Sequence, residues 1–250
     1  MRTYIVESVR SLLMLNQVLR YIPIMDILNI YRRLSKLDSL DMKILEVGSG
    51  PNGIGEYISN FFVGCDIKFN GRINPKMLPV VGSATNLPFR DESFDIVLSI
   101  DMLEHIKRAE RAEVINELIR VSKRLTIIAC PCGRKSQKCE QKLLLWYQLI
   151  RRKYPDWLIE HVKNGLPSEN EILQVIQKRR YLILNNENVF VHACVIMIES
   201  LIAKVTNKLA ELLLSLSINF KSPITRLLSL GEPYRKIFII WRGGYCLDHE

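Results

Sequence analysis

Residues 44–55 read Ile-Leu-Glu-Val-Gly-Ser-Gly-Pro-Asn-Gly-Ile-Gly, a short apolar run followed by four glycines within eight residues. Because glycine has no Cβ, such a turn lets the backbone approach a ligand closely. A strand that delivers an acidic side chain, here Glu46, into a glycine-rich turn is typical of a site for a nucleoside-containing cofactor. The segment predicts a cofactor site near the start of an α/β domain.

Short β-branched runs alternate with longer helical patterns from residue 43 to about residue 242. The expected strands are 43–47, 62–67, 80–81, 94–100, 125–129, 181–184 and 236–241. Helices are expected at 54–61 and 109–121 and through the basic stretch after Pro131, whereas the type of the apolar run 189–198 stays open. This alternation predicts a three-layer, doubly wound Rossmann-like sheet with helices on both faces.

Two helical patterns lie outside this alternation. Apolar residues recur at helical spacing from Tyr4 to about Leu37, with an interruption at Pro23, and a second apolar stripe runs over 195–216. We expect residues 1–40 to form an N-terminal helical segment and residues 41–250 one domain with a helical insertion at about 195–230. The two helices could pack on each other, form a homodimer face or lie on a membrane.

Composition limits the partners and the compartment. An excess of 35 Lys and Arg over 26 Asp and Glu gives a net charge of +9, which suits anionic partners or simply a basic surface. The six cysteines are scattered in a chain too long to need a disulfide scaffold, so we expect reduced thiols in the cytoplasm. Cys130, Cys132 and Cys139 lack the spacing of a zinc site, and no metal is expected. The N-terminal stretch carries charged residues, so we expect no signal peptide there.

Gly48, Gly50 and Gly53 fit the pattern G-x-G-x-x-G, which would equally suit a dinucleotide-binding oxidoreductase. Asp66 follows Glu46 by 20 residues at the end of the second expected strand, where a carboxylate can accept both hydroxyls of an adenosine ribose. A dehydrogenase would carry the same acid. It would not usually carry Glu46 two residues before the first glycine, nor the downstream segments 82–89 and 93–97.

The chain resembles the class I S-adenosylmethionine-dependent methyltransferases, in the group that includes many small-molecule methyltransferases. The matching segments are Leu45-Glu46-Val47-Gly48-Ser49-Gly50, Gly64-Cys65-Asp66-Ile67, Leu87-Pro88-Phe89 with Ser93-Phe94-Asp95, and Leu103-Glu104-His105-Ile106. They cover about residues 40–135. The resemblance implies a sheet of about seven mostly parallel strands. Its sixth and seventh strands, the seventh antiparallel, would come from the segments near 182, 190 and 238.

The resemblance also implies the cofactor, S-adenosyl-L-methionine, and the residues that would hold it. Glu46 and the turn Gly48-Ser49-Gly50 would hold the methionine part, and Asp66 the ribose. Ser83 and Ala84 would frame the adenine; Ser83 stands where many relatives have an acid, and its hydroxyl would accept the adenine amine more weakly. Three residues after the fourth strand would close over the sulfonium: Asp101, Met102 and Leu103.

Methyl transfer to oxygen needs an aligned acceptor and a group that removes a proton. His105 is a candidate base because an imidazole titrates near neutral pH, although the Glu-His-Ile stretch is shared by relatives with different substrates and a structural role stays open. His161 is a second candidate, in a stretch where a substrate lid would fall; it could equally be an ordinary loop histidine. Its surroundings, His-x-x-x-Gly-Leu-Pro, are similar to methyltransferases of glycan assembly.

We therefore expect methyl transfer to a small-molecule or glycan-like acceptor, more readily at oxygen than at nitrogen. The net charge leaves an RNA or protein methyltransferase as an alternative, although the chain lacks the Asn/Asp-Pro-Pro-Tyr/Phe tetrapeptide of many base-amine methylating relatives. A non-catalytic module that keeps the fold and binds a partner through its apolar helices is a further alternative, and a nicotinamide-dependent oxidoreductase is another.

Overall fold

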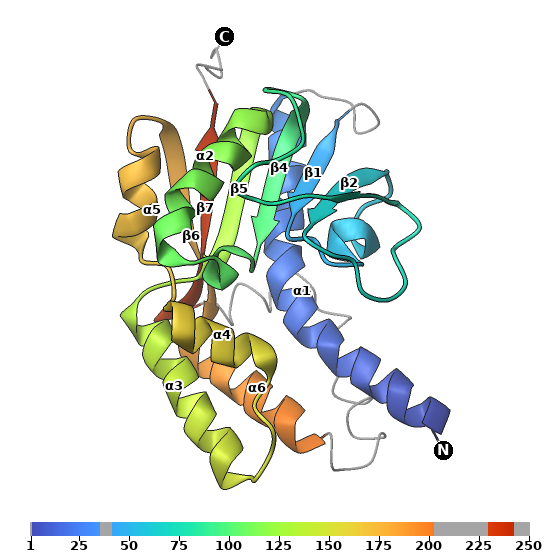
Figure 1. Ribbon diagram of the computed structural model, residues 1–250, viewed down its shortest axis with the longest axis vertical. Helices are drawn as coiled ribbons and strands as arrows, with labels where there is room; N and C mark the ends of the chain where they lie inside the picture. The colour runs from blue at the N-terminus through green and yellow to red at the C-terminus, as the bar shows by residue number, and fades with distance from the viewer. Residues whose placement is uncertain (1, 36–41, 203–229, 243–250) are drawn as a thin grey trace.

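The computed structural model describes residues 2–35, 42–202 and 230–242 (Figure 1). Its helices are α1 (Arg2–Ser35), α2 (Arg111–Val121), α3 (Arg134–Leu149), α4 (Asp156–Asn164), α5 (Glu169–Ile176) and α6 (Val189–Ile202). Its strands are β1 (Ile44–Val47), β2 (Phe62–Asp66), β3 (Met77–Val81), β4 (Phe94–Ile100), β5 (Ser122–Pro131), β6 (Arg180–Asn188) and β7 (Pro233–Trp241). Short 3₁₀ turns cover Gly53–Glu56, Leu103–His105 and Arg108–Glu110.

The seven strands form one sheet in the order β3-β2-β1-β4-β5-β7-β6. Neighbouring strands pair in parallel except at β7, which is antiparallel to both β5 and β6. The expected Rossmann-like sheet of about seven strands with one antiparallel strand is confirmed. Because the glycine turn follows β1 and the order reverses between β1 and β4, the turn lies where such sheets bind ligands.

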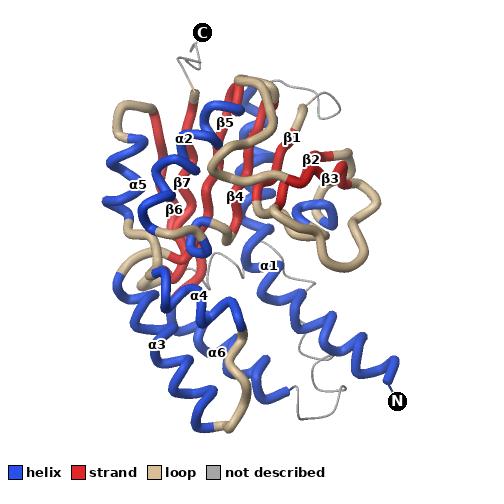
Figure 2. The backbone as a smooth tube through the Cα atoms, in the orientation of Figure 1, coloured by secondary structure: helices blue, strands red, loops and turns tan. Residues whose placement is uncertain are grey.

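Alternating side chains divide the core into two faces, which gives the three layers seen in Figure 2. Leu45, Val97 and Phe238 face α2 and α5, whereas their neighbours Ile44, Ile96 and Ile237 face α1. A third group of apolar residues joins α3, α4 and α6 beyond the carboxyl ends of the strands (Figure 1). No helix of the described ranges is both long enough and apolar enough to cross a membrane.

Helix α1 is one helix through Pro23, so the expected interruption is wrong. Proline lacks the N–H that would bind the carbonyl four residues earlier, which here belongs to Leu19. The side-chain amide of Asn186 donates to that carbonyl at 3.1 Å, so the orphaned acceptor is satisfied from β6. Ile24 and Leu28 are buried against the sheet, and this half of the helix is part of the same core.

The helix expected over 54–61 is also wrong, because only the 3₁₀ turn Gly53–Glu56 forms there. The Lys76 ammonium donates to the carbonyls of Gly55 and Ile58, at 3.1 and 2.7 Å, and so takes acceptors that a helix would use. The undecided run 189–198 is helical and lies in α6. The expected stripe over 195–216 is described only to residue 202, and most of the expected insertion lies outside the described residues.

Candidate functional site

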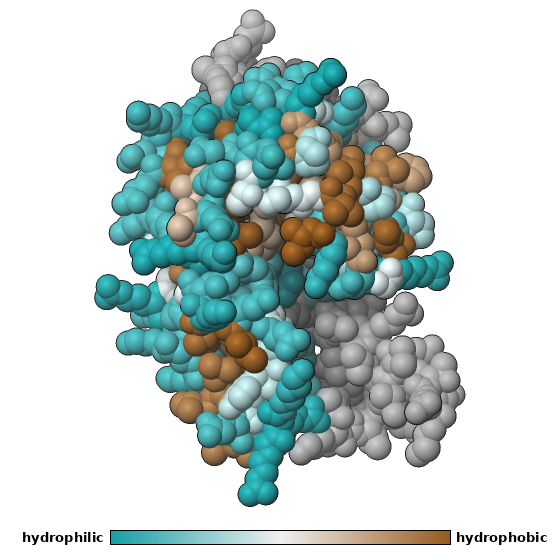
Figure 3. Space-filling view, in the orientation of Figure 1, coloured by the Kyte–Doolittle hydropathy of each residue, from teal (hydrophilic) through white to brown (hydrophobic). Residues whose placement is uncertain are grey.

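A cleft opens at the carboxyl ends of β1, β2 and β4. Its walls are the glycine turn, the residues that follow β2, β3 and β4, and one side of α1. Figure 3 shows a mostly hydrophilic face with two groups of hydrophobic side chains, one around β2 and β3 and one over α3 and α4. Ile67 belongs to the exposed apolar residues of the first region and also lines the cleft.

The glycine turn has a left-handed backbone at Gly48 and Gly50. Gly48 has φ +76°, and a Cβ there would lie 2.3 Å from Met102 Cγ. Gly50 has φ +54°, and a Cβ there would meet no atom within 4 Å. Gly48 therefore allows two chain segments to pack, whereas Gly50 presents bare backbone to the cleft.

Asp66 lies at the end of β2 and its carboxylate borders the cleft. Oδ2 accepts a hydrogen bond from the Gly50 amide at 2.8 Å, which fixes the carboxylate beside the glycine turn. Ile67, the next residue, is 69% exposed and lines the cleft, where its side chain offers apolar surface. Ile67 ends one of the segments on which the sequence resemblance rests, but no role was expected for its side chain.

Glu46 is fully buried and does not line the cleft. Its Oε1 accepts from the Tyr21 hydroxyl at 2.8 Å, and its Oε2 accepts from the Ile54 amide at 2.6 Å. Burial raises the pKa of Glu46 to about 7, although both hydrogen bonds act to lower it. Glu46 thus ties α1 to the glycine turn from behind, and the structure does not bring it beside Asp66 as a second carboxylate of the cleft.

Ser83 and Ala84 line the cleft after β3. The Ser83 hydroxyl lies 2.8 Å from that of Thr85 and accepts from the Thr85 amide at 3.3 Å. Ala84 is largely buried. The pair offers a small, weakly polar wall opposite the glycine turn.

The three residues expected after β4 have different surroundings. Asp101 lines the cleft in a left-handed conformation, φ +48°. Burial acts to raise its pKa, but the guanidinium groups of Arg235 and Arg20 outweigh burial and lower the pKa to about 2. Met102 lines the cleft, whereas Leu103 is fully buried in the core and does not.

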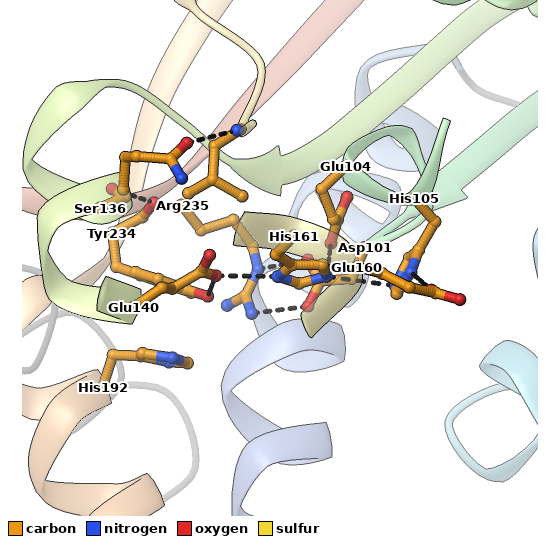
Figure 4. Close-up of polar contacts among 12 residues, drawn as sticks. Asp101, Glu104, His105, Ser136, Glu140, Glu160, His161, His192, Tyr234 and Arg235 are labelled. Atoms are coloured by element: carbon orange, nitrogen blue, oxygen red, sulfur yellow. Dashed lines mark hydrogen bonds and ion pairs between the residues drawn. The ribbon is translucent and has the colours of Figure 1, made fainter. Parts of the chain in front are cut away.

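The two candidate bases, His105 and His161, lie side by side although 56 residues separate them (Figure 4). Their Nε2 atoms are 3.2 Å apart. His105 Nδ1 lies 2.7 Å from Glu160 Oε2, and His161 Nδ1 lies 2.8 Å from Glu140 Oε1. Burial, and then the neighbouring His161, lowers the pKa of His105. His161 is in helix α4, not in a loop, and only His105 of the pair lines the cleft.

Several residues of this site were not expected from the sequence. Gln17, Arg20 and Tyr21 of α1 line the cleft, and Arg235 holds Asp101 through two hydrogen bonds of 2.6 and 2.7 Å. Nothing in the spacing links α1 or β7 to the turn after β4. Arg20 alone could have been suspected from the sequence, because it is a charged residue within an otherwise apolar stretch.

The family model and the curated relative that match this chain are both methyltransferases. A family model described as a methyltransferase domain matches residues 45–130. The chain is 32% identical over 123 residues to the tRNA (carboxymethyluridine(34)-5-O)-methyltransferase of Arabidopsis thaliana. The aligned segment covers 46% of this chain and 30% of that protein. The chain thus spans under a third of that relative's length.

Two solved structures share the fold. One is the magnesium protoporphyrin IX methyltransferase of Synechocystis PCC 6803 with bound SAH, with a TM-score of 0.52, 11% identity, and coverage of 89% of this chain and 84% of that chain. The other is phosphoethanolamine N-methyltransferase 2 of Haemonchus contortus in complex with S-adenosyl-L-methionine, with a TM-score of 0.51, 16% identity, and coverage of 87% and 52%. At such identities the likeness concerns the fold.

Proposed function

We propose that this chain, which carries a class I S-adenosylmethionine-dependent methyltransferase domain, binds S-adenosyl-L-methionine in the cleft and transfers its methyl group to an acceptor oxygen. The observation that carries the proposal is that the glycine turn, Asp66 and His105 line one cleft, with His161 in contact with His105 behind it. The match over residues 45–130 favours this activity over that of a nicotinamide-dependent oxidoreductase.

The residues of the cleft fit the cofactor. Gly50 leaves bare backbone for the methionine part, and Asp66 offers its carboxylate to the ribose hydroxyls. Ile67 and Ala84 supply apolar surface for the adenine, and Ser83 a hydroxyl beside it. When bound, the sulfonium supplies an already activated methyl group, so the protein's own task is to orient the acceptor and take up its proton.

Glu46 acts in this proposal as a positioning residue. Both of its oxygens are occupied by Tyr21 and by the Ile54 amide, so it holds the glycine turn rather than the cofactor. Met102 and the carboxylate of Asp101 border the cleft beside the turn. The histidine pair lies at the same end, where it would activate the acceptor oxygen.

The charge of the cleft favours an uncharged, hydroxyl-bearing acceptor, such as a small molecule or a glycan-like compound. Its cationic lining residues are Arg20 and Lys68. Its acidic lining residues are Asp66, Asp101, Glu110, Glu113 and Glu160. A polyanion would be repelled at such a surface, whereas sugar hydroxyls can donate to carboxylates.

RNA is the second candidate acceptor. The specific observation in its favour is the similarity to a methyltransferase named for an oxygen of a tRNA uridine derivative, and the net charge of +9 agrees with it. Salt-dependent retention of tRNA by the purified protein, with methyl transfer to it, would favour RNA over the glycan-like acceptor.

Five described cysteines are free, which supports a reducing compartment such as the cytoplasm.

Calorimetric titration with S-adenosylhomocysteine tests the cofactor assignment. Asp66→Asn should weaken binding about 10- to 100-fold, the scale of a charged hydrogen bond. Asp91→Asn is the matched control, because Asp91 pairs with Arg120 away from the cleft. Absence of binding at millimolar ligand by the folded wild-type protein would overturn the proposed function, and equal affinities in the wild-type and Asp66→Asn proteins would overturn the role of Asp66.

A further inference from the structure

Three side chains that could bind a metal meet behind the acceptor end of the cleft: Glu104, His105 and His161. One ligand atom from each lies within 4.8 Å of the others. His161 Nε2 is 3.2 Å from His105 Nε2 and 4.0 Å from Glu104 Oε1 (Figure 4). Two nitrogens bound tetrahedrally to one zinc-sized ion lie about 3.3 Å apart, given bonds of about 2.0–2.1 Å.

The partners on the other side of each ring decide where its lone pair points. Each Nδ1 faces a carboxylate, Glu160 for His105 and Glu140 for His161. A neutral imidazole that donates Nδ1–H to a carboxylate carries its lone pair on Nε2. Two neutral rings would then aim both lone pairs at one point, an arrangement that a cation between them stabilises. Histidine ligands held by carboxylates in this way are the usual outer shell of a metal site.

Glu104 adds an independent observation. Its side chain is 0% exposed, and neither carboxylate oxygen has a hydrogen-bond partner among the described residues. An unpartnered buried carboxyl group is costly and rare, unless it serves an ion or a ligand.

We propose that Glu104, His105 and His161 bind one divalent transition-metal ion. Two imidazoles and one carboxylate form the donor set of zinc hydrolases and of non-haem iron sites, whereas magnesium and calcium prefer oxygen ligands alone. Three protein ligands leave a coordination position open, and His105 borders the cleft.

The role of the ion in catalysis rests on the proposed function, although its binding does not. An acceptor hydroxyl at the open position would have its pKa lowered, would release its proton to solvent in the cleft, and would have its oxygen oriented toward the cofactor methyl. The two histidines would then act on the acceptor through the ion, rather than as bases themselves. Such a site suits an acceptor with a hydroxyl and gives no comparable advantage to an amine that is already nucleophilic.

Cobalt(II) is the probe, because its d–d absorption reports both the geometry and the ligand type. The full chain, stripped with a chelator, should take up one equivalent of cobalt at micromolar concentration, with a nitrogen- and oxygen-ligand spectrum that zinc abolishes. His105→Gln and Glu104→Gln should each weaken uptake at least about 100-fold, and Glu160→Gln about 10-fold. His192→Gln is the matched control: His192 is also buried, with Nδ1 3.0 Å from the Glu187 carboxylate, but lies outside the cluster.

Circular dichroism confirms that each variant is folded, and the wild-type spectrum needs no variant. A spectrum with sulfur-to-cobalt charge transfer would place the ion on cysteines and overturn the proposal. So would no uptake by the wild-type protein, or equal uptake by the wild-type and His105→Gln proteins. Titration of the same sample with S-adenosylhomocysteine separates the proposals, because normal cofactor binding without cobalt uptake would overturn the metal site and leave the cofactor assignment standing.

Discussion

The hydroxyl of Tyr21 donates a hydrogen bond of 2.8 Å to Glu46 Oε1, between two buried side chains that come from α1 and β1. The same carboxylate accepts from the Ile54 amide, so a single buried group joins the N-terminal helix to the turn that borders the cleft. The position of the glycine turn therefore depends on a helix that the sequence places before the α/β pattern.

Tyr21→Phe removes this hydrogen bond and leaves Glu46 Oε1 without its donor. The loss of one partner from a buried pair should lower the free energy of unfolding by about 1–3 kcal/mol, measured by urea denaturation. Tyr57→Phe is the control, because the Tyr57 ring stacks on Tyr21 at 5.0 Å while its hydroxyl has no hydrogen-bond partner in the described residues. Equal losses for both variants would show that the Tyr21 hydroxyl contributes nothing.

Glu46 should make stability depend on pH. The folded protein keeps the Glu46 proton up to about pH 7, whereas the unfolded chain loses it near the ordinary value of 4.5. Between these values the folded state binds more protons, so this group's contribution to stability falls as pH rises. Glu46→Gln cannot titrate, and its stability relative to the wild type should increase by about 2–3 kcal/mol from pH 5 to pH 8. A difference that stays constant across this range would contradict the assignment.

Gly48 and Gly50 should respond differently to alanine. Gly48→Ala forces a Cβ against Met102 and should cost more than about 2 kcal/mol of stability, measured by thermal or urea denaturation. Gly50→Ala meets no protein atom, so only its left-handed backbone costs about 1 kcal/mol. Its Cβ should instead weaken binding of S-adenosylhomocysteine. If Gly50→Ala binds as the wild type does, the turn does not contact the cofactor.

Arg235 is buried between Asp101 and Glu187, with a shortest contact of 2.5 Å to Glu187 Oε2. Arg235→Met would remove the guanidinium that pairs with the buried carboxylates of Glu187 and Asp101, leaving Asp101 with Arg20 alone, and should lower stability by about 3–5 kcal/mol. Lys135→Met breaks the exposed pair with Glu232 and should cost no more than about 1 kcal/mol. Denaturation of both variants at neutral pH measures the contrast, and comparable losses would show that the buried pair adds no stability.

The sheet could be predicted from the sequence because each buried strand has a local signature. Phe94–Ile100 is rich in β-branched and apolar residues, with Asp95 and Ser99 as its polar members, and the structure has a strand with these same bounds. Ser168 and Glu171 form a capping box at the start of α5, and this signature is also local because both partners are close in the chain. The helix expected at 54–61 failed because its carbonyls bind Lys76, a residue outside any local window.

The site was predicted less completely because its contacts join distant segments. His105 and His161 were each candidates, but no local pattern indicates that α4 brings their Nε2 atoms together. The contact between Arg235 and Asp101 spans 134 positions, and the antiparallel pairing of β7 creates it. Glu46 was expected beside the cofactor because it precedes the glycines, whereas the pleat of β1 turns it toward Tyr21.

Helix α1 reaches the cleft on two sides, since Tyr21 binds Glu46 while Arg20 pairs with Asp101 at 2.8 Å. The stretch that a family model matches, residues 45–130, therefore lacks two side chains that support the cleft in this molecule. A fragment that started at β1 would keep every glycine of the turn. It would lose Tyr21, which binds Glu46 behind the turn, and Arg20, one of the two cations that neutralise Asp101.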